Sequence, residues 1–297
     1  MSHPLRRLGG ALEPVIGQIY FAPEAHAEYE QLGFAESSGT FNGVAGPDGP
    51  AYFTSRGSVM GQVSGGVVAS AFAVFDPRVV VPCVDHGWSL TDAPTICAAR
   101  DRGALGQLTR LLGERPDGLD RCVDLLRRAT SPLTPEGRPL YAGLALLDPP
   151  DHPLGELWRL GDRLREFRGD GHTLAWVGAG LDACEIGLLT ELFWGLPLRS
   201  YTRTRGWSDE RFDRATASLE SRGLVADGAF TDAGRSLREG IESTTDALCA
   251  PIADALGHDD IDELCSILEP WGATVRAGHG YPAAGPHDLA DRVSRST

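Results

Sequence analysis

The sequence predicts a mainly α protein in which two tandem halves repeat one order of helices, with small β-hairpins. Apolar residues recur at helical spacing through most of the 297 residues. The tripeptide Gly-Trp-Ser begins at residues 87 and 206, each time ahead of an amphipathic helical segment. Asp227-Gly228 is a tight-turn signal between two short strand-like runs. The chain is also long enough to bury a substantial core.

Composition predicts a globular chain without a membrane anchor. Hydrophobic residues make up 42% and charged residues 23%, and no apolar run approaches the ~18 residues that a spanning helix needs. Glu13, Pro14 and Pro23 interrupt the N-terminal stretch before the apolar core of a secretion signal could form, so the expected location is cytoplasmic.

Charge and cysteine usage exclude several classes. With 27 basic and 41 acidic residues, the net charge of −14 disfavours nucleic acid as a partner without excluding it. The six cysteines show no pair at zinc spacing, which predicts reduced thiols, no disulfide and no structural metal. No nucleophile elbow, P-loop or dinucleotide fingerprint is present, so no cofactor is expected.

The first half, residues 1–150, is predicted to be helical around one loop or hairpin near Gly46 to Gly49, with Ala51 to Thr54 as its strand-like piece. Pro23 divides the first apolar segment, and Asp76-Pro77 ends the most apolar one. The expected helices cover about 12–32, 59–75, 77–83, 92–112 and 119–129.

The second half begins near residue 150, because Pro149 and Pro150 end one segment and Pro153 opens a long amphipathic helix. We expect a unit over 151–250, then a C-terminal helix (252–268) and a loose tail within 251–297. Within the unit, helices are expected at 182–192, 198–204 and after 207–210, followed by a hairpin at 224–231 and another helix. This is the order of a winged helix-turn-helix.

The run from Ile186 to Asp246, with LESRGLV and FTDAGRSLREGIE, resembles the DNA-binding core of MarR-type regulators. The whole chain is similar to a SalR-like set of actinobacterial helix-turn-helix proteins through its segments at 52–64, 137–140 and 164–172. The repeated Gly-Trp-Ser order predicts two tandem winged-helix-like units in one chain, a pseudo-dimeric arrangement that would mimic a MarR-type dimer, although the identities between the halves are few enough to arise by chance. The N-terminal unit would be degenerate, because its wing region, 113–119, is short and acidic.

The predicted recognition helix is poorly suited to DNA. Its tip, Ser208-Asp209-Glu210, carries two carboxylates that favour the helix dipole but repel phosphates. Eight arginines face seven acids between residues 197 and 240, and the wing VADGAFT has no basic residue. The candidate DNA contacts are Arg199, Arg203, Arg205, Arg211 and Arg214.

A candidate ligand site lies in the segment from Arg165 to His172, which is expected to end the long helix. Arg168, Asp170 and His172 gather there beside Trp176, with glycines on both sides of Asp170. His172 could act as a general acid/base oriented by Asp170, while Arg168 anchors an acidic ligand. In the alternative, Asp170 caps the next helix and Arg168 makes an ordinary ion pair.

Aromatic residues with arginine form a second candidate ligand-binding set, suited to a flat acidic ligand. The same residues could equally be core or interface. The set comprises Tyr52, Phe53, Arg56, Met60, Trp88, Tyr201 and Trp207.

These patterns lead to two functional hypotheses. The first is a small-molecule-binding protein of secondary metabolism with a pocket between its halves and weakened or lost DNA binding. Its ligand would be a small aromatic or acidic organic molecule, and a cofactor-free acid/base reaction is a further possibility. The second is a ligand-responsive DNA-binding transcriptional regulator. Either protein would be a monomer or a homodimer.

Overall fold

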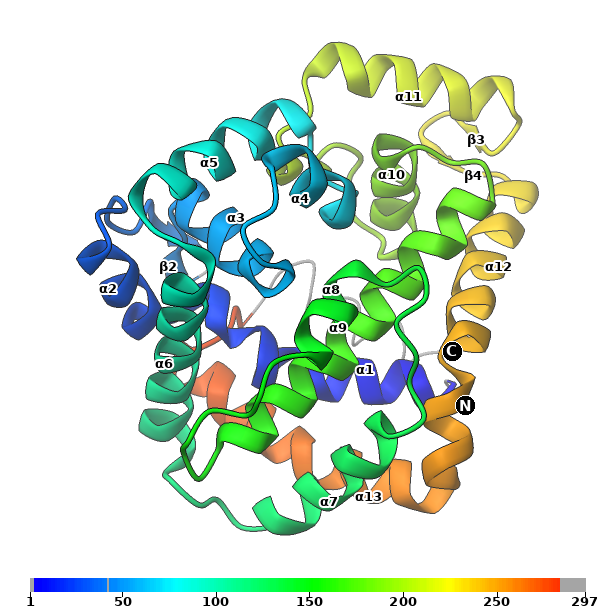
Figure 1. Ribbon diagram of the computed structural model, residues 1–297. Coiled ribbons are helices and arrows are strands. Elements are labelled where there is room, and N and C mark those ends of the chain that lie inside the picture. Colours follow the sequence, from blue (N-terminus) through cyan, green and yellow to red (C-terminus); the bar gives the residue numbers. More distant parts are fainter. Residues whose placement is uncertain (1–2, 42, 284–297) are drawn as a thin grey trace.

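The computed structural model describes residues 3–41 and 43–283, and it is mainly helical, as predicted (Figure 1). One long helix, α9 (Gly155–Gly178), lies between the two halves and is buried on several faces. It packs against α1, α6, α7, α8 and α12. Most of its residues up to Gly171 are buried, whereas Leu174 and Val177 near its end are exposed. α9 is therefore the element around which the others are arranged.

The elements before α9 are helices of different lengths and one hairpin. They are α1 (Pro4–Ile16), η1 (Gly17–Phe21), α2 (Pro23–Gln31), β1 (Gly39–Phe41), β2 (Val44–Gly46), α3 (Gly49–Gly57), η2 (Ser58–Met60), α4 (Gly65–Phe72), α5 (Pro77–Leu90), α6 (Ala93–Leu112), α7 (Leu119–Thr130) and α8 (Pro139–Ala145). The elements after α9 are α10 (Ala183–Phe193), η3 (Thr202–Arg205), α11 (Asp209–Ser221), β3 (Val225–Ala226), β4 (Ala229–Phe230), α12 (Asp232–Leu248) and α13 (Ala250–Ala277).

Aspartates start several of these helices. Asp48, Asp76, Asp92 and Asp182 each accept a hydrogen bond from a backbone N–H in the first turn of α3, α5, α6 and α10. Such a cap satisfies one of the N–H groups that have no partner inside the helix. At the first three of these helices a proline at the first or second position follows the cap, where its missing N–H costs nothing.

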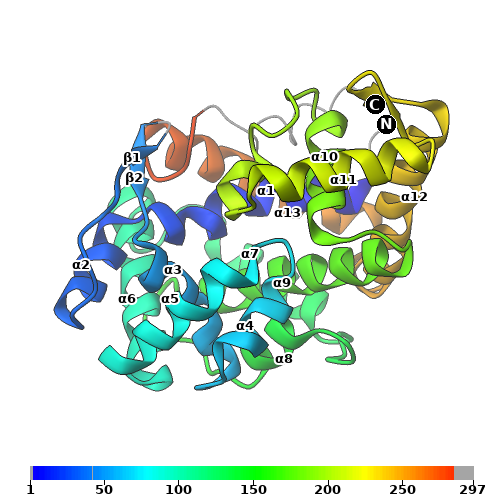
Figure 2. The same ribbon diagram turned by 90° about the horizontal axis from the view of Figure 1, so that it is seen from above.

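The C-terminal half has the predicted order of helix, short helix, helix, hairpin and helix. β3 and β4 pair antiparallel, with Val225 opposite Phe230, around Asp227 and Gly228, which both have positive φ. Phe212 and Leu219 of α11 pack with Ile186 of α10 in one core. α11 lies along the upper edge of the molecule in Figure 1 and in front in Figure 2, so it is a surface helix.

The N-terminal half opens with the same order, α1, η1, α2, β1–β2 and α3, but the tandem arrangement of two winged units is not confirmed. The hairpin β1–β2 does not lie at the predicted wing, residues 113–119, which instead lead from α6 into α7. The first Gly-Trp-Ser lies in the last turn of α5, whereas the second forms the turn into α11. The expected helix over 59–75 is also divided, because Gly61 has a φ of 82° and Ser64 is the N-cap of α4. The expected strand-like piece over 51–54 is wrong, because Asp48 caps a helix, α3, that contains these residues.

Two other expectations are corrected. The predicted loop between Arg165 and His172 lies inside α9, where a side chain at Gly171 would come 2.7 Å from the Nη1 of Arg138. Gly171 therefore admits this arginine and does not break the helix. The tail after Trp271 is not loose as far as it is described, because α13 continues to Ala277 and Tyr281 is fully buried. The rest of that tail, 284–297, lies outside the described residues.

The largest hydrophobic core contains residues from Leu5 to Trp271, so it crosses the predicted boundaries near residues 150 and 250. A second core joins α10, α11 and α12, and a third lies among α3, α4, α5 and α8. Among the described residues, no helix is long and apolar enough to cross a membrane.

Candidate ligand cavity

A cavity of about 580 Å³ lies between the two halves of the molecule. Its walls come from α1, α9, α10 and α12, with η3 closing one side and Arg56 of α3 reaching in. Gly9 and Gly10 of α1 and Gly169 of α9 leave room where larger side chains would project. A cavity of this volume is within the range that accommodates a small organic molecule.

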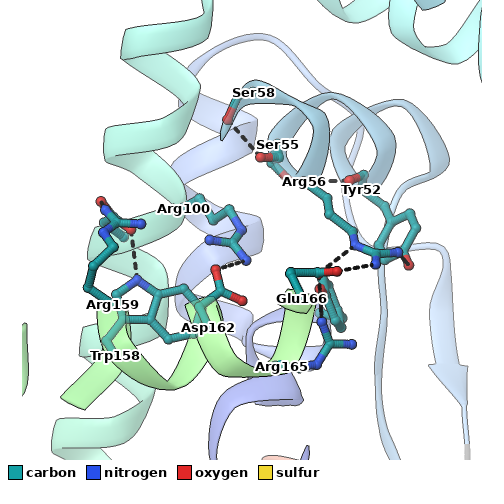
Figure 3. A network of polar contacts seen from close by, with 12 residues as sticks. Tyr52, Ser55, Arg56, Ser58, Arg100, Trp158, Arg159, Asp162, Arg165 and Glu166 are labelled. Carbon is teal, nitrogen blue, oxygen red and sulfur yellow. Dashed lines mark hydrogen bonds and ion pairs between the residues drawn. The ribbon is translucent and has the colours of Figure 1, made fainter. Parts of the chain in front are cut away.

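One end of the cavity is lined by a charged network around Glu166 of α9 (Figure 3). Arg56 binds this carboxylate through two hydrogen bonds, Nε to Oε1 at 3.1 Å and Nη2 to Oε2 at 2.9 Å. Arg165 donates to Glu166 at 2.8 Å and to Glu13 of α1 at 2.9 Å. Burial raises the pKa of Glu166, but Arg56 and Arg165 outweigh burial and bring this pKa down to about 2.

A second charged network lines the other end, where α9 meets α12. Glu242 accepts from Arg238 at 2.7 Å and from Arg168 at 3.1 Å. Burial raises the pKa of Glu242, but Arg238 above all holds it well below its usual range. Arg6 of α1 pairs with Glu239 and Asp246, each at 2.7 Å. These arginines are therefore matched by carboxylates.

Arg205 is the exception among the lining arginines. No carboxylate in the described part of the chain forms an ion pair with it, although the other five lining arginines each have one. Its guanidinium lies between Phe75, 4.6 Å away, and Tyr201, 4.5 Å away, and donates to the Tyr201 hydroxyl. Burial lowers the pKa of Arg205, yet a guanidinium stays charged in proteins. Within residues 3–41 and 43–283, Arg205 is thus the lining arginine that no carboxylate neutralises.

His172 lines the same cavity from α9. Its Nδ1 lies 3.1 Å from Oγ1 of Thr245, whose hydroxyl donates to the carbonyl of Ile241 at 2.8 Å. Since that hydroxyl proton is engaged, Thr245 accepts from His172, which places the ring proton on Nδ1 and a lone pair on Nε2. Burial lowers the pKa of His172 to about 3 despite the opposing effect of Glu242, so the ring is neutral at physiological pH.

Asp170 does not contact His172, so the predicted pair does not form. Two residues apart on a helix, the two side chains lie on nearly opposite faces. Asp170 accepts the backbone N–H of Tyr141 at 3.0 Å and thereby caps α8, and burial raises its pKa to about 7. This role is close to the alternative interpretation of the segment, in which Asp170 caps the helix that follows it. Trp176 belongs to the second core and not to the cavity wall.

The aromatic candidates divide between the cavity and the core. Arg56 and Tyr201 line the cavity, and Tyr52 lies within hydrogen-bond distance of Arg56 at 3.3 Å. Trp88 and Trp207 donate from Nε1 to the carbonyls of Val63 (2.7 Å) and Val74 (3.0 Å), so both are structural. Two others pack in the third core, Phe53 and Met60.

The candidate DNA contacts are occupied within the protein. Four of them are in ion pairs with carboxylates on α11 or at the start of α10: Arg199 with Asp213, Arg203 with Asp209, Arg211 with Asp182 and Arg214 with Glu210, at 2.7–2.8 Å. The fifth, Arg205, points into the cavity. Exposed pairs of this kind are weak, but the carboxylates stay beside the arginines when a phosphate approaches.

Sequence reasoning missed the α1 and α12 side of the cavity, including Glu13, Arg238, Glu242 and Thr245. The partners are remote in sequence: Arg168 and Glu242 are 74 residues apart. Only the spacing of Arg238 and Glu242, which are four residues apart on one helix, could have predicted an ion pair from the sequence. Within the described ranges, no three or more His, Cys, Asp or Glu side chains gather where they could hold a metal ion.

A comparison with protein families matches the chain to a helix-turn-helix family over residues 5–282. The chain belongs to this helix-turn-helix family. The match spans both halves, so the family is defined by the whole arrangement and not by α10, η3 and α11 alone. No curated protein and no solved structure matches this helix-turn-helix protein.

Proposed function

We propose that this helix-turn-helix protein binds a small organic anion in the cavity between its halves. The observation that carries the proposal is Arg205, which lines the cavity beside the rings of Phe75 and Tyr201 and pairs with no carboxylate among the residues that the structure describes. Burying an uncompensated charge is costly, and a ligand carboxylate would relieve that cost through a charge-assisted hydrogen bond.

The remaining wall supports an anion with an apolar body. Apolar side chains also line the cavity, among them Leu164, Ile186 and Phe193. Carboxylates already present on the protein neutralise the other lining arginines, so a ligand with a single negative charge balances the site. An aromatic or aliphatic monocarboxylic acid has this chemistry.

Arg205→Gln tests the proposal. Phenylacetate and phenylacetamide have the same shape and differ in charge, so the ratio of their dissociation constants isolates the carboxylate. For the natural chain we expect calorimetry to give a ratio of about 10 to 100 in favour of the acid, the range of a charge-assisted hydrogen bond. Arg205→Gln removes this preference, and Arg205→Lys retains part of it.

Arg214→Gln is the matched control, because Arg214 lies on the exposed face of α11 in a pair with Glu210. It should bind phenylacetate as the natural chain does. Equal affinity of the natural chain and Arg205→Gln for the acid would refute the proposal, as would binding of neither probe.

Membership of a helix-turn-helix family supports a second candidate, a ligand-responsive DNA-binding regulator of the MarR-like kind. η3, the short helix before α11, supplies Arg205 to the cavity, so a ligand there would touch the DNA-facing unit directly. Two observations count against this candidate. Four of the arginines proposed to contact DNA are in ion pairs, and the wing has no basic residue. A gel-shift assay at low salt with the DNA upstream of its own gene distinguishes the two candidate functions. Specific binding at nanomolar protein concentration would support the DNA-binding regulator.

The acid/base reaction remains a hypothesis about His172. The lone pair on Nε2 could accept a proton, but burial lowers the pKa of His172 to about 3, which makes the ring a weak base, and Thr245 takes the orienting place predicted for Asp170. If His172 transfers a proton, His172→Ala should lower turnover about 10²- to 10⁴-fold without loss of folding.

A further inference from the structure

We propose that the cavity selects acids that carry a hydroxyl group at the end remote from the carboxylate, as hydroxyaryl carboxylic acids do. In this arrangement Arg205 binds the carboxylate and Nε2 of His172 accepts the hydroxyl proton. The inference rests on the proposed function and adds the class of ligand and its orientation.

The two groups lie at different ends of the cavity. The guanidinium of Arg205 lies 4.6 Å from the ring of Phe75, whose centroid is 5.9 Å from that of Tyr52. Arg56 donates to both Tyr52 and Glu166, which places Arg205 at the end with Glu166. Nδ1 of His172 lies 3.9 Å from Glu242, which accepts from Arg238 and Arg168 at the end facing α12. Glu166 and His172 are six residues apart on α9, which corresponds to about 9 Å along the helix axis. One aromatic ring with a short carboxylate arm fills such a span.

The chemistry at the His172 end favours a neutral donor. A second carboxylate would face the lone pair of Nε2 and the negative charge of Glu242, which lies 3.9 Å from Nδ1. An ammonium group would be repelled by Arg168 and Arg238 at the same end. A hydroxyl group is neutral and donates one hydrogen bond, so it satisfies Nε2 without adding charge.

Hydrogen bonding within the protein leaves Nε2 available. Nδ1 is held by Thr245, and no hydrogen bond from the described residues reaches Nε2. Nε2 is not one of the buried polar atoms that lack a partner, so it keeps accessible surface. Because His172 lines the cavity, we take this surface to face the cavity space. A fixed acceptor of this kind discriminates between ligands, because a ligand that lacks the donor leaves it unpaired.

Calorimetry with 4-hydroxyphenylacetate, phenylacetate and 4-methoxyphenylacetate tests the inference. The methoxy compound keeps the oxygen but cannot donate. For the natural chain we expect the hydroxy acid to bind about five- to tenfold more tightly than either of the others, as one additional hydrogen bond implies.

Two variants of His172 keep the test specific. His172→Asn retains a donor for Thr245 but has no atom at the position of Nε2, so the preference for the hydroxy acid should disappear. His172→Gln can place its amide oxygen near the position of Nε2, so it should restore part of the preference. Thermal unfolding of each variant shows that it is folded.

The outcomes separate the two proposals. If all three acids bind through Arg205 with equal affinity, or if His172→Asn keeps the preference, the inference about the hydroxyl group is wrong and the proposed function stands. If Arg205→Gln binds the acids as the natural chain does, or if no acid binds, the proposed function fails and the inference with it.

Discussion

Asp170 and His172 are two residues apart on α9 and have opposite responses to the same physical effect. Burial disfavours the charged form of each, so it raises the pKa of the Asp170 carboxyl to about 7 and lowers the pKa of the His172 imidazole to about 3. Their different partners follow from the faces on which they lie. Asp170 caps α8 through Tyr141, and His172 faces the cavity beside Thr245.

Asp170→Asn should stabilise the protein at alkaline pH. The pKa of Asp170 is higher in the folded than in the unfolded state, so the natural protein loses stability as pH rises from about 4 to 7. Asparagine can still accept the Tyr141 N–H and does not ionise. Relative to the natural chain, we expect the free energy of unfolding of Asp170→Asn to increase by about 2–3 kcal/mol between pH 5 and pH 8.

Urea unfolding at the two pH values measures this difference. Both proteins contain His172, so its titration cancels in the comparison. Asp170→Ala is the control: it loses the cap and should be less stable than Asp170→Asn at both pH values by about 1 kcal/mol. A difference between Asn and Asp that shrinks as pH rises would contradict the raised pKa.

At the scale of elements, α11 has the place of a recognition helix with the charges of a solvent-exposed helix. Asp209, Glu210 and Asp213 lie in its first half and pair with Arg203, Arg214 and Arg199. Ser208 caps the helix, and the carboxylates near its N-terminus favour its dipole. What stabilises α11 therefore weakens its attraction for DNA.

Neutralising these acids should increase affinity for DNA of any sequence. In the triple variant D209N/E210Q/D213N three arginines lose their partners and the helix gains three units of positive charge. We expect nonspecific binding to a duplex to become about 10- to 100-fold tighter at low salt, with a steeper dependence on salt concentration. Fluorescence anisotropy at about 50 and about 200 mM salt measures both the affinity and its dependence on salt concentration.

The control is D117N/D120N/D124N, which changes the net charge equally at and before α7. If this variant gains as much affinity as the triple variant on α11, the effect belongs to net charge and the surface of α11 has no special relation to DNA.

At the scale of the whole molecule, the two ends of the described chain are packed together. α1 lies along α13, and the segment after α13 returns to α1 and α6. Gln107 donates to the carbonyl of Gly280 at 3.2 Å, and the Tyr281 hydroxyl donates to Glu13 at 3.2 Å. The Tyr281 ring also packs edge-on against Phe21, with centroids 5.5 Å apart.

Tyr281→Ala should therefore destabilise the whole protein and not only its end. Removing a fully buried aromatic ring costs about 3–5 kcal/mol of unfolding free energy, and urea unfolding measures this loss. Tyr281→Phe keeps the ring and loses only the hydroxyl contact, so it should cost about 1 kcal/mol. Equal losses for both variants would mean that the hydroxyl, and not ring packing, holds the segment.

The sequence by itself determined the features that depend on a few neighbouring residues. Capping aspartates start α5, α6 and α10, and Asp227-Gly228 forms the hairpin turn, because caps and turns are satisfied within about four residues. Helical spacing predicted the mainly α fold and the acid-tipped α11 for the same reason. Asp48 caps α3 in the same way, but the segment of α3 was predicted to be strand-like.

Tertiary structure decided whatever depends on partners remote in sequence. Gly-Trp-Ser is helical in α5 and a turn before α11, since one tripeptide takes the conformation that its packing favours. Gly169 and Gly171 remain helical because Arg138 and the surrounding helices pack against α9. Arg205 lies in the cavity because Phe75 and Tyr201 hold its guanidinium there, and Phe75 is 130 residues away along the chain. Local preferences cannot encode such contacts, because their free energy comes from burial and charge pairing that exist only in the folded chain.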